Sequence, residues 1–267
     1  MVDTAQHDAW QAGQSYEQYM GRWSRQIAPL FLRWLDAPAG AEWLEVGCGT
    51  GALTANILAL SDPKSVVAID PSADFLKEAR GRIADQRVVF RVGEALNLDE
   101  AEQSKDVVVS GLVLNFVADR ANAIGLMRRV ARPDARIGFY VWDYPGGGVQ
   151  FMRAFWNAAK DLDPSAAALT EDRRFPFCTP EGLNELASEA GLQSVQVTAI
   201  EALTVFTDFE DFWRPFTLGT GPAPGYCMSL AVDARERLRA RLSETLPRQA
   251  DGSIRLTARA WAVKARP

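Results

Sequence analysis

Three glycines and one acidic residue near the start of the chain have a spacing that suits nucleoside binding. Gly47, Gly49 and Gly51 follow the mostly apolar run 43–46, and a helical pattern begins directly after them. Glycine permits positive φ and lets a ligand approach the backbone, while a helix N-terminus favours negative partial charge. Asp70 ends the next apolar run, where its carboxylate can accept both hydroxyls of a ribose. The spacing therefore predicts a nucleoside-containing cofactor.

The order of the motifs resembles that of the class I S-adenosylmethionine-dependent methyltransferases. Residues 44–51, LEVGCGTG, look like the first motif of that family, and residues 66–72, VVAIDPS, look like the second. Residues 106–116 resemble the fourth strand with its following loop, and residues 179–191 resemble the helix before a final antiparallel strand pair. The resemblance covers roughly residues 40–142 and two late strands. It implies S-adenosyl-L-methionine as the cofactor.

The resemblance also implies which residues border the cofactor. Glu94 and Ala95 stand beside the adenine, although the family usually has Asp where this chain has Glu94. In similar methyltransferases a leading helix folds over the cofactor, so Tyr19 and Arg22 are expected to close the site, with Arg22 paired to the cofactor carboxylate. An equal alternative is that this helix only covers apolar surface. The expected cofactor-binding residues are Tyr19, Arg22, Glu45, Gly47, Cys48, Gly49, Gly51, Asp70, Pro71, Gly93, Glu94, Ala95, Ser110 and Leu112.

Two residues of the first motif have chemistry of their own. A carboxylate at Glu45 can hold the cationic amino end of a methionine moiety, whereas it would repel a diphosphate. This favours S-adenosylmethionine over NAD(P), which leaves an NAD(P)-dependent oxidoreductase and a non-catalytic adenosylmethionine-binding protein as the alternatives. Cys48 lies at the start of a helix, a position that can lower a thiol pKa, and the resemblance makes it a neighbour of the cofactor.

The rest of the pattern predicts the elements that position these residues. Apolar runs of strand length alternate with amphipathic helical stretches, which is typical of βαβ units around a buried parallel sheet. Ser72 and Thr179 are expected to cap helices, and Gly191 to end one. We expect a Rossmann-like α/β fold with a seven-stranded, mostly parallel sheet, helices on both faces and an inserted, mainly helical cap. The expected strands are Glu42–Val46, Ser65–Ile69, Val88–Arg91, Asp106–Ser110, Ala135–Trp142, Val195–Val205 and Ile254–Val263.

Two segments, 144–178 and 207–250, are too long and too aromatic for ordinary connections. We interpret them as a cap that binds the substrate, with residues 1–40 as an N-terminal helical lid. Residues 41–143, 179–206 and 251–267 then form the core. Large rings more often pack in a core than bind ligands, and this is the alternative for each of them. The candidate substrate-binding residues are Trp142, Tyr144, Phe155, Trp156, Trp213 and Tyr226.

Methyl transfer from a sulfonium is an in-line displacement that needs mainly alignment and exclusion of water, and it requires no metal. A base is needed only when the nucleophile carries a proton at the working pH. Asp143 and Tyr144 follow the fifth strand and are the catalytic candidates, with a polar cap on the strand end as the alternative. His7, the single histidine, lies in a polar terminal stretch and is expected to be solvated.

Composition limits the partners. The chain has 267 residues and a net charge of −5 with no lysine- or arginine-rich block, which argues against a nucleic-acid partner. Its three cysteines show no metal-binding spacing, and no apolar run approaches the roughly 18 residues of a membrane span. These features predict a cytoplasmic protein, monomeric or homodimeric, with a small-molecule methyl acceptor.

Overall fold

Residues 17–219 and 221–267 are described in the computed structural model, and the chain divides into two units. The sheet unit comprises Ser24–Trp142, Phe177–Ile200 and Ala260–Pro267. The helical unit comprises the described residues up to Trp23, together with Asp143–Pro176 and Glu201–Arg259. His7, Tyr16 and the rest of the expected lid up to residue 16 lie outside the described residues, as does Thr220 of the expected cap.

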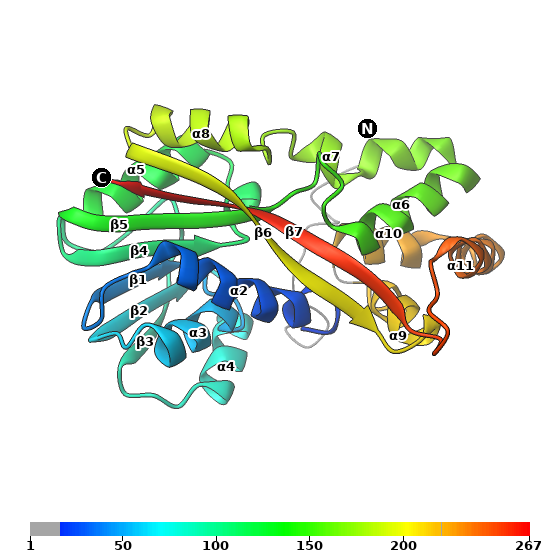
Figure 1. The fold of residues 1–267 in the computed structure, drawn as a ribbon, viewed down its shortest axis with the longest axis horizontal. Coiled ribbons are helices and arrows are strands. Elements are labelled where there is room, and N and C mark those ends of the chain that lie inside the picture. Colours follow the sequence, from blue (N-terminus) through cyan, green and yellow to red (C-terminus); the bar gives the residue numbers. More distant parts are fainter. Residues whose placement is uncertain (1–16, 220) are drawn as a thin grey trace. The chain divides into compact units, whose positions relative to one another are not determined.

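The sheet has seven strands in the order β3-β2-β1-β4-β5-β7-β6 (Figure 1). Neighbouring strands from β3 to β5 pair in parallel, and β7 pairs antiparallel with β5. This confirms the predicted Rossmann-like sheet, in which the carboxyl ends of the parallel strands share one edge. The strands are β1 (Glu42–Val46), β2 (Ser65–Asp70), β3 (Val88–Val92), β4 (Lys105–Gly111), β5 (Ala131–Trp142), β6 (Gln193–Phe206) and β7 (Ile254–Arg266).

One strand differs clearly from its predicted start. β5 begins at Ala131, four residues before the expected start at Ala135. The pairing with β4 shifts register here, from Lys105 opposite Ala131 to Val107 opposite Arg136. This irregularity accommodates Pro133, which has no N–H to donate to a regular ladder.

The helices of the sheet unit begin and end largely where the capping residues predict. The Ser72 hydroxyl accepts the amide of Phe75, the Thr179 hydroxyl accepts the amide of Gly182, and Gly191 has φ +80° just past the last helix. Helix α5 packs on β4, β5 and α8, while α4 packs on β2 and β3. The helices are α2 (Arg22–Leu35), which starts in the helical unit, α3 (Ala52–Leu60), α4 (Ala73–Arg82), α5 (Arg120–Val130), α8 (Pro180–Glu189) and the short 3₁₀ helix η3 (Leu114–Phe116).

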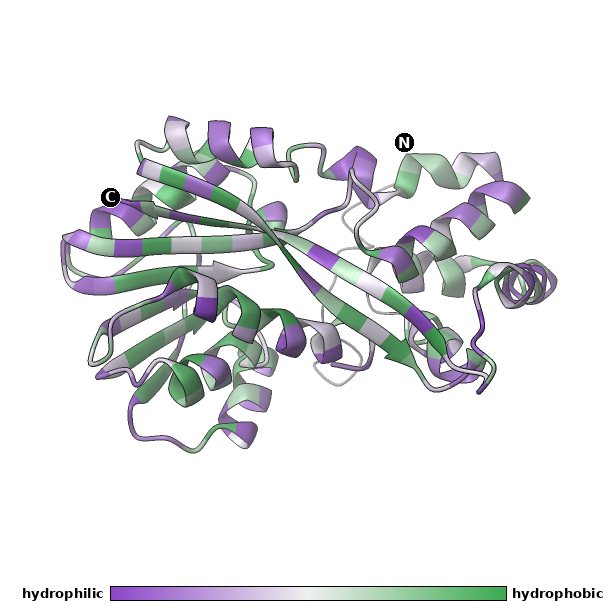
Figure 2. Cartoon of the chain, in the orientation of Figure 1, coloured by the Kyte–Doolittle hydropathy of each residue, from purple (hydrophilic) through white to green (hydrophobic). Residues whose placement is uncertain are grey.

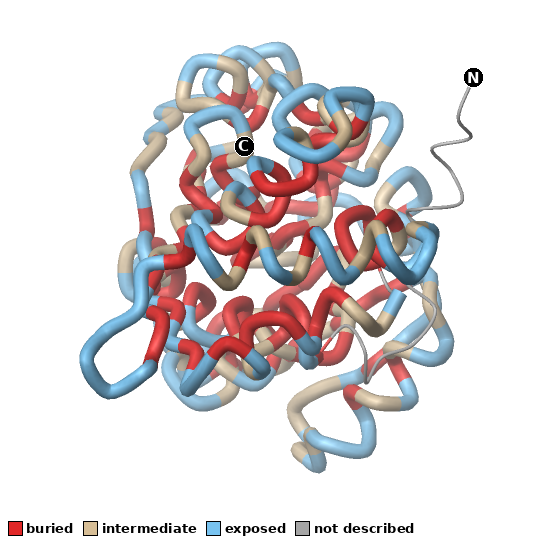
Figure 3. Tube along the Cα trace, turned by 90° about the vertical axis from the view of Figure 1, so that its right-hand side faces the viewer, coloured by how far each residue is buried: buried red, intermediate tan, exposed pale blue. Residues whose placement is uncertain are grey.

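The helical unit has an aromatic core, as the density of large rings predicts. Phe155 stacks on Phe216 with ring centroids 4.4 Å apart, and Tyr19 meets the rings of Phe151 and Phe216 edge-on. Buried residues fill the interior and the outer helix faces are exposed (Figure 3). The elements are η2 (Glu17–Gly21), α6 (Gln150–Leu162), η4 (Pro164–Leu169), α7 (Glu171–Arg174), α9 (Phe209–Trp213), η5 (Arg214–Thr217), α10 (Pro222–Ser229) and α11 (Val232–Thr245).

Helix α11, the last helix of this unit, packs through a narrow apolar stripe. Helix α11 is largely hydrophilic (Figure 2), and its buried residues are Leu238 and Leu242. Their spacing of four places both side chains on one face. That face packs against α6.

Candidate functional site

The glycine loop between β1 and α3 adopts a conformation that favours glycine at each of its three positions. Gly47, Gly49 and Gly51 have φ values of +77°, +55° and +88°. A Cβ on Gly47 would lie 2.3 Å from the Val113 side chain, and one on Gly51 would lie 2.7 Å from Ile83. A Cβ on Gly49 would meet nothing within 4 Å. Open space at Gly49 is therefore where a ligand can approach the backbone.

Asp70 holds this loop in place. Its Oδ2 accepts the amide of Gly49 at 2.8 Å, and its Oδ1 accepts the amide of Ser72 at 2.8 Å. The side chain is largely buried, and burial raises the pKa of the carboxyl. Because each carboxylate oxygen has more than one acceptor site, both oxygens can still accept a ligand hydroxyl.

Glu45 lies on β1 just before the loop and is fully buried. Its Oε2 accepts the hydroxyl of Thr54, on α3, at 2.6 Å. Burial raises the pKa of Glu45 to about 8, the Thr54 hydrogen bond lowers it, and the nearby Asp70 carboxyl raises it. The carboxyl is thus protonated at neutral pH unless a cation binds close to it.

The helix that follows Cys48 does not lower the pKa of its thiol. Its thiol is buried, and this burial, with the carboxyls of Glu45 and Asp70 in support, raises its pKa well above the ordinary value. The Sγ lies 3.9 Å from the carbonyl oxygen of Gly49. A thiol in this environment stays protonated, so Cys48 is a packing residue of the loop.

The loop after β4 joins the ends of three strands. The Ser110 hydroxyl donates to the carbonyl of Val46 at 2.8 Å, which fixes the end of β4 beside the start of the glycine loop. Leu112 has φ +63°, uncommon for a residue with a side chain, and its amide donates to the carbonyl of Tyr140 on β5. Such strain persists only where surrounding contacts enforce it, and it gathers at ligand sites.

The same loop contains an amide side chain without a partner. Asn115 is buried, and its Nδ2 has no hydrogen-bond partner among the residues that the structure describes. Arg120 fixes the turn from α5 by donating to the carbonyls of Leu114 and Asn115, and its guanidinium lies over the Phe177 ring. A buried donor left open in a rigid loop is suited to a ligand acceptor.

The residues expected beside the adenine follow β2 and β3. Pro71 is exposed, and the amide of Gly93 donates to the carbonyl of Asp70 at 3.2 Å. The side chain of Glu94 is exposed, and Ala95 is half-buried. These positions lie at the carboxyl ends of neighbouring strands, and their contact with adenine stays a prediction.

The donor set fits a nucleoside cofactor with a cationic end. Gly51 at the N-terminus of α3 provides no side-chain cap to the amides of the first turn. Asp70 retains acceptor capacity, and Glu45 is a buried acid that a cation would ionise. The structure thus supplies acceptors for hydroxyls and countercharge for an ammonium or sulfonium group.

Asp143, a catalytic candidate, is already bonded on both oxygens. Its Oδ2 accepts from the guanidinium of Arg259 at 2.7 Å, and its Oδ1 accepts the amide of Gly146 at 2.9 Å. A Cβ on Gly146 or Gly148 would lie within 2.7 Å of the carboxylate, so the glycines let the loop wrap around it. This geometry suits a residue that positions the loop, and a catalytic role for Asp143 stays a prediction.

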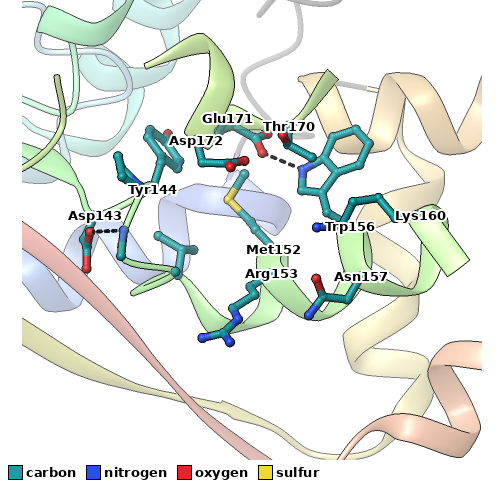
Figure 4. A pocket seen from close by; sticks show the side chains of 14 residues that line it. Asp143, Tyr144, Met152, Arg153, Trp156, Asn157, Lys160, Thr170, Glu171 and Asp172 are labelled. Carbon is teal, nitrogen blue, oxygen red and sulfur yellow. Dashed lines mark hydrogen bonds between the residues drawn. The ribbon is translucent and has the colours of Figure 1, made fainter. Parts of the chain in front are cut away.

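A pocket of about 370 Å³ lies within the helical unit (Figure 4). Its walls include Tyr144 from the loop after β5, Met152, Trp156 and Lys160 from α6, and Glu171 from the start of α7. Tyr144 also packs on the Phe175 ring at 5.5 Å. Two of the predicted substrate-binding residues, Tyr144 and Trp156, therefore line one pocket.

Glu171 is the residue that sequence reasoning missed. It is buried, its Oε2 accepts the indole N–H of Trp156 at 2.5 Å, and burial raises its pKa to about 7. Its Oε1 has no hydrogen-bond partner among the residues described. In the sequence it looks like an ordinary exposed acid in the first turn of a helix, so no local signal could have identified it.

The other predicted substrate residues are buried. Phe155 and Tyr226 pack in the aromatic core of the helical unit, where Tyr226 lies 5.4 Å from the Trp156 ring. Trp213 is buried on α9, and Trp142 ends β5 opposite Ala260. None of these four lines the pocket in the helical unit. Their burial agrees with the alternative that large rings pack in a core. Their contact with substrate stays a prediction.

The two expected lid residues lie in the helical unit. The Arg22 guanidinium pairs with Asp211 at 2.8 Å and donates to the carbonyl of Val205. The Tyr19 ring is buried, and its hydroxyl has no hydrogen-bond partner within the described part of the chain. Their roles toward the cofactor stay predictions, and Arg22 would have to exchange Asp211 for the cofactor carboxylate.

Residues 17–219 and 221–267 show neither a helix suited to cross a membrane nor a side-chain cluster suited to a metal ion. None of the helices in these ranges is long and apolar enough to cross a membrane. The same residues contain no group of three or more His, Cys, Asp or Glu side chains arranged to hold a metal ion.

Known structures share this fold. Phosphoethanolamine N-methyltransferase 2 of Haemonchus contortus, in complex with S-adenosyl-L-methionine, superposes with a TM-score of 0.60 at 18% identity, over 96% of this chain and 56% of that one. The YcgJ protein of Bacillus subtilis superposes with a TM-score of 0.58 at 15% identity, over 90% of this chain and 97% of that one. At such low identity these matches establish the fold alone.

Sequence comparison identifies the family. A family model described as a methyltransferase domain matches residues 44–139, which include the glycine loop and Asp70. A demethylmenaquinone methyltransferase of Roseiflexus is 29% identical over 59% of this chain and 70% of that protein. An uncharacterized methyltransferase of Mycobacterium tuberculosis is 32% identical over 60% of this chain and 68% of its own length. Because the similarity to the mycobacterial protein covers 68% of a methyltransferase, and the family model covers the glycine loop, the chain belongs to the S-adenosyl-L-methionine-dependent methyltransferases.

Proposed function

We propose that this methyltransferase transfers the methyl group to a small molecule. The observation that carries the proposal is the pocket of about 370 Å³ in the helical unit, whose walls combine the rings of Tyr144 and Trp156 with the polar groups of Lys160 and Glu171. Pockets of this size and composition suit ligands of metabolite size. We assign acceptor binding to the helical unit and cofactor binding to the sheet unit.

The charge of the chain and the names of its relatives support a small acceptor. The net charge of −5, without a basic block, does not favour the phosphate backbone of a nucleic acid. One relative is named a demethylmenaquinone methyltransferase, and one protein of the same fold is named a phosphoethanolamine N-methyltransferase. Both names refer to small acceptors, although the two acceptors differ in chemistry.

We assign four positions of the sheet unit to the cofactor. Asp70 would accept the ribose hydroxyls, the open backbone at Gly49 would border the ligand, and Glu45 would ionise beside its cationic end. Asn115 would donate from the loop after β4. When bound, S-adenosyl-L-methionine supplies a methyl group attached to a positively charged sulfur.

The work of the protein is then to align the acceptor and to exclude water. In an in-line displacement the acceptor lone pair forms a bond to the methyl carbon while the carbon–sulfur bond breaks. Holding both partners in line can lower the activation free energy by roughly several kcal/mol. Buried walls such as Trp156 and Met152 keep solvent from the acceptor. A base is required only if the attacking atom still carries a proton.

Two measurements test the proposal. Calorimetric titration with S-adenosylhomocysteine and with NADH should show binding of the first and none of the second. Turnover of methyl-labelled S-adenosylmethionine against a panel of quinols, phenols and amines should then transfer label to at least one small molecule. Transfer of label only to protein or nucleic acid in a cell extract would contradict a small-molecule acceptor.

A further inference from the structure

Glu171 is a buried acid whose bonding is incomplete. Its exposed fraction is 4%, and only Oε2 is bonded, to the indole N–H of Trp156. Oε1 has no partner among the described residues, and no Lys or Arg of that set forms an ion pair with this carboxyl. A buried carboxylate without a second bond and without a directly paired cation is unfavourable. A ligand that supplies both would relieve that cost.

A second unpartnered group lies near the same acid. The hydroxyl of Tyr19 on η2 is buried and has no hydrogen-bond partner in the described part of the helical unit. The Glu171 charge lies close enough to raise the pKa of Tyr19, after the larger effect of burial. Buried polar atoms without a partner are rare in native interiors, and Oε1 of Glu171 is the one of these two that belongs to a residue lining the pocket.

The groups around Glu171 determine which ligand fits. The rings of Trp156 and Tyr144 and the thioether of Met152 line the pocket next to the carboxyl (Figure 4). Such walls accept hydrocarbon and attract a cation through the ring faces. Asp143 is neutralised by Arg259. The remaining charged or titratable groups around the pocket and beside Glu171 are Arg153 and Lys160 on α6, Asp172 and Arg174 on α7, Tyr144 and Tyr19.

We propose that this pocket binds an organic ammonium group, which donates hydrogen bonds to the free Oε1 of Glu171 while its hydrocarbon part packs on Trp156. An ammonium has up to three N–H donors, so one can bond Oε1 of Glu171 while the others remain for further acceptors. Exposed Arg153 and half-exposed Lys160 disfavour a cation at the outer wall, which places the ammonium at the buried end. The inference rests on the proposed function and makes its acceptor an amine. The bound ammonium gives one proton to the Glu171 carboxylate, and the freed nitrogen lone pair then forms the bond to the methyl carbon as the carbon–sulfur bond breaks.

The proposal has a pH signature. The pKa of Glu171 is about 7. Burial raises it most, its own backbone amide, Trp156 and Arg174 lower it, and Asp172 raises it. A cation binds the ionised carboxyl better than the protonated one, so affinity should rise as pH increases through about 7. Binding below that pH should release a proton. A neutral alcohol would show neither effect.

Three probes of similar shape test the inference on the full chain with S-adenosylhomocysteine present. Titration calorimetry with 2-phenylethylamine, 2-phenylethanol and 3-phenylpropanoate is run at pH 6, 7 and 8, in buffers of different ionisation enthalpy. We expect the amine to bind at least tenfold more tightly than the other two, with affinity increasing from pH 6 to pH 8 and proton release at pH 6. Equal binding of amine and alcohol, or no binding of the amine, overturns the inference.

Two variants locate the effect. E171Q keeps the shape and the Trp156 hydrogen bond but removes the charge, so amine affinity should fall at least tenfold and lose its pH dependence. E236Q removes an exposed carboxylate of the same unit that does not line the pocket, and it should leave the affinity unchanged. If E171Q binds the amine as tightly as the unmodified chain does, the inference is overturned. If E171Q does not fold, the comparison of the three probes on the unmodified chain tests the inference. If the unmodified chain binds no S-adenosylhomocysteine, or transfers no methyl group to any small molecule, the proposed function itself is refuted.

Discussion

Asp70 Oδ2 lies 2.8 Å from the amide nitrogen of Gly49, so the end of β2 directly holds the loop that follows β1. The pair is 21 residues apart in sequence, and parallel pairing of the two strands brings it together. The bond aligns the only loop glycine that has open space beside its Cα position. One carboxylate therefore shapes the loop and still has acceptor capacity for a ligand.

Replacing Asp70 tests whether it is needed for cofactor binding. D70A should weaken S-adenosylhomocysteine binding by at least tenfold, about 1.4 kcal/mol, because it removes both the loop bond and the ribose acceptor. D62N changes an exposed carboxylate of the same unit and should leave the affinity unchanged. Titration calorimetry measures both, and an unaltered affinity in D70A would show that Asp70 does not hold the ribose.

Gly49 and Gly40 form a matched pair. Both have positive φ, and a Cβ on either would meet nothing within 4 Å. Each alanine variant should therefore lose about 1 kcal/mol of unfolding free energy through backbone strain alone. Only G49A should also lose affinity for S-adenosylhomocysteine, by tenfold or more, because its methyl group would occupy space that we assign to the ligand. Equal affinities of G49A and G40A would place the cofactor elsewhere.

Glu45 should make stability fall as pH rises. Its pKa is about 8 in the folded chain and near 4.5 when unfolded, so between these values the folded state binds the additional proton. Stability is thus highest below about pH 4.5 with respect to this group and decreases until about pH 8. E45Q should remove that dependence and gain at least about 2 kcal/mol relative to the unmodified chain at pH 8.5.

Urea unfolding at pH 5.5 and pH 8.5 measures this difference. Glu42 provides a control of opposite sign, because Lys64 and Arg132 hold its pKa at about 2, so E42Q should lose stability at neutral pH. If E45Q and the unmodified chain have the same difference in unfolding free energy between pH 5.5 and pH 8.5, Glu45 is not protonated as inferred.

The Asp143–Arg259 pair tests whether Asp143 positions or catalyses. The carboxylate is buried, so D143N should remove the buried half of this ion pair and cost on the order of 2 kcal/mol of unfolding free energy, although Arg259 keeps its contact with Glu201. R259M should cost a similar amount, because it leaves the carboxylate unpaired. We expect kcat per folded molecule to change less than fivefold in both variants once an acceptor is known. A loss of kcat above a hundredfold in D143N alone, with its pH profile altered, would make Asp143 a catalytic base.

Much of the sheet unit was predictable because its signals are local. Strand ends such as Val46 and Trp142 were predicted at the observed residues, and Ser72 and Thr179 cap helices as expected. These features depend on hydrophobic period and on capping chemistry within a few residues. The start of β5 was not predicted, because its first residues include Pro133 and pair with β4 through an irregular register.

The candidate site divides in the same way. The sequence by itself determined the glycine loop, Asp70 and the family, since a strand, a turn and a helix in succession specify where their residues lie. Only the tertiary structure decided that Glu45 is a buried acid bonded to Thr54, that Asp143 is paired across 116 residues with Arg259, and that the thiol of Cys48 is inert. Glu171 is the clearest case, because its burial against Trp156 depends on how α6 and α7 pack. Burial and countercharge are set by residues distant in sequence, and these two quantities decide whether a carboxyl is solvated or able to bind a ligand.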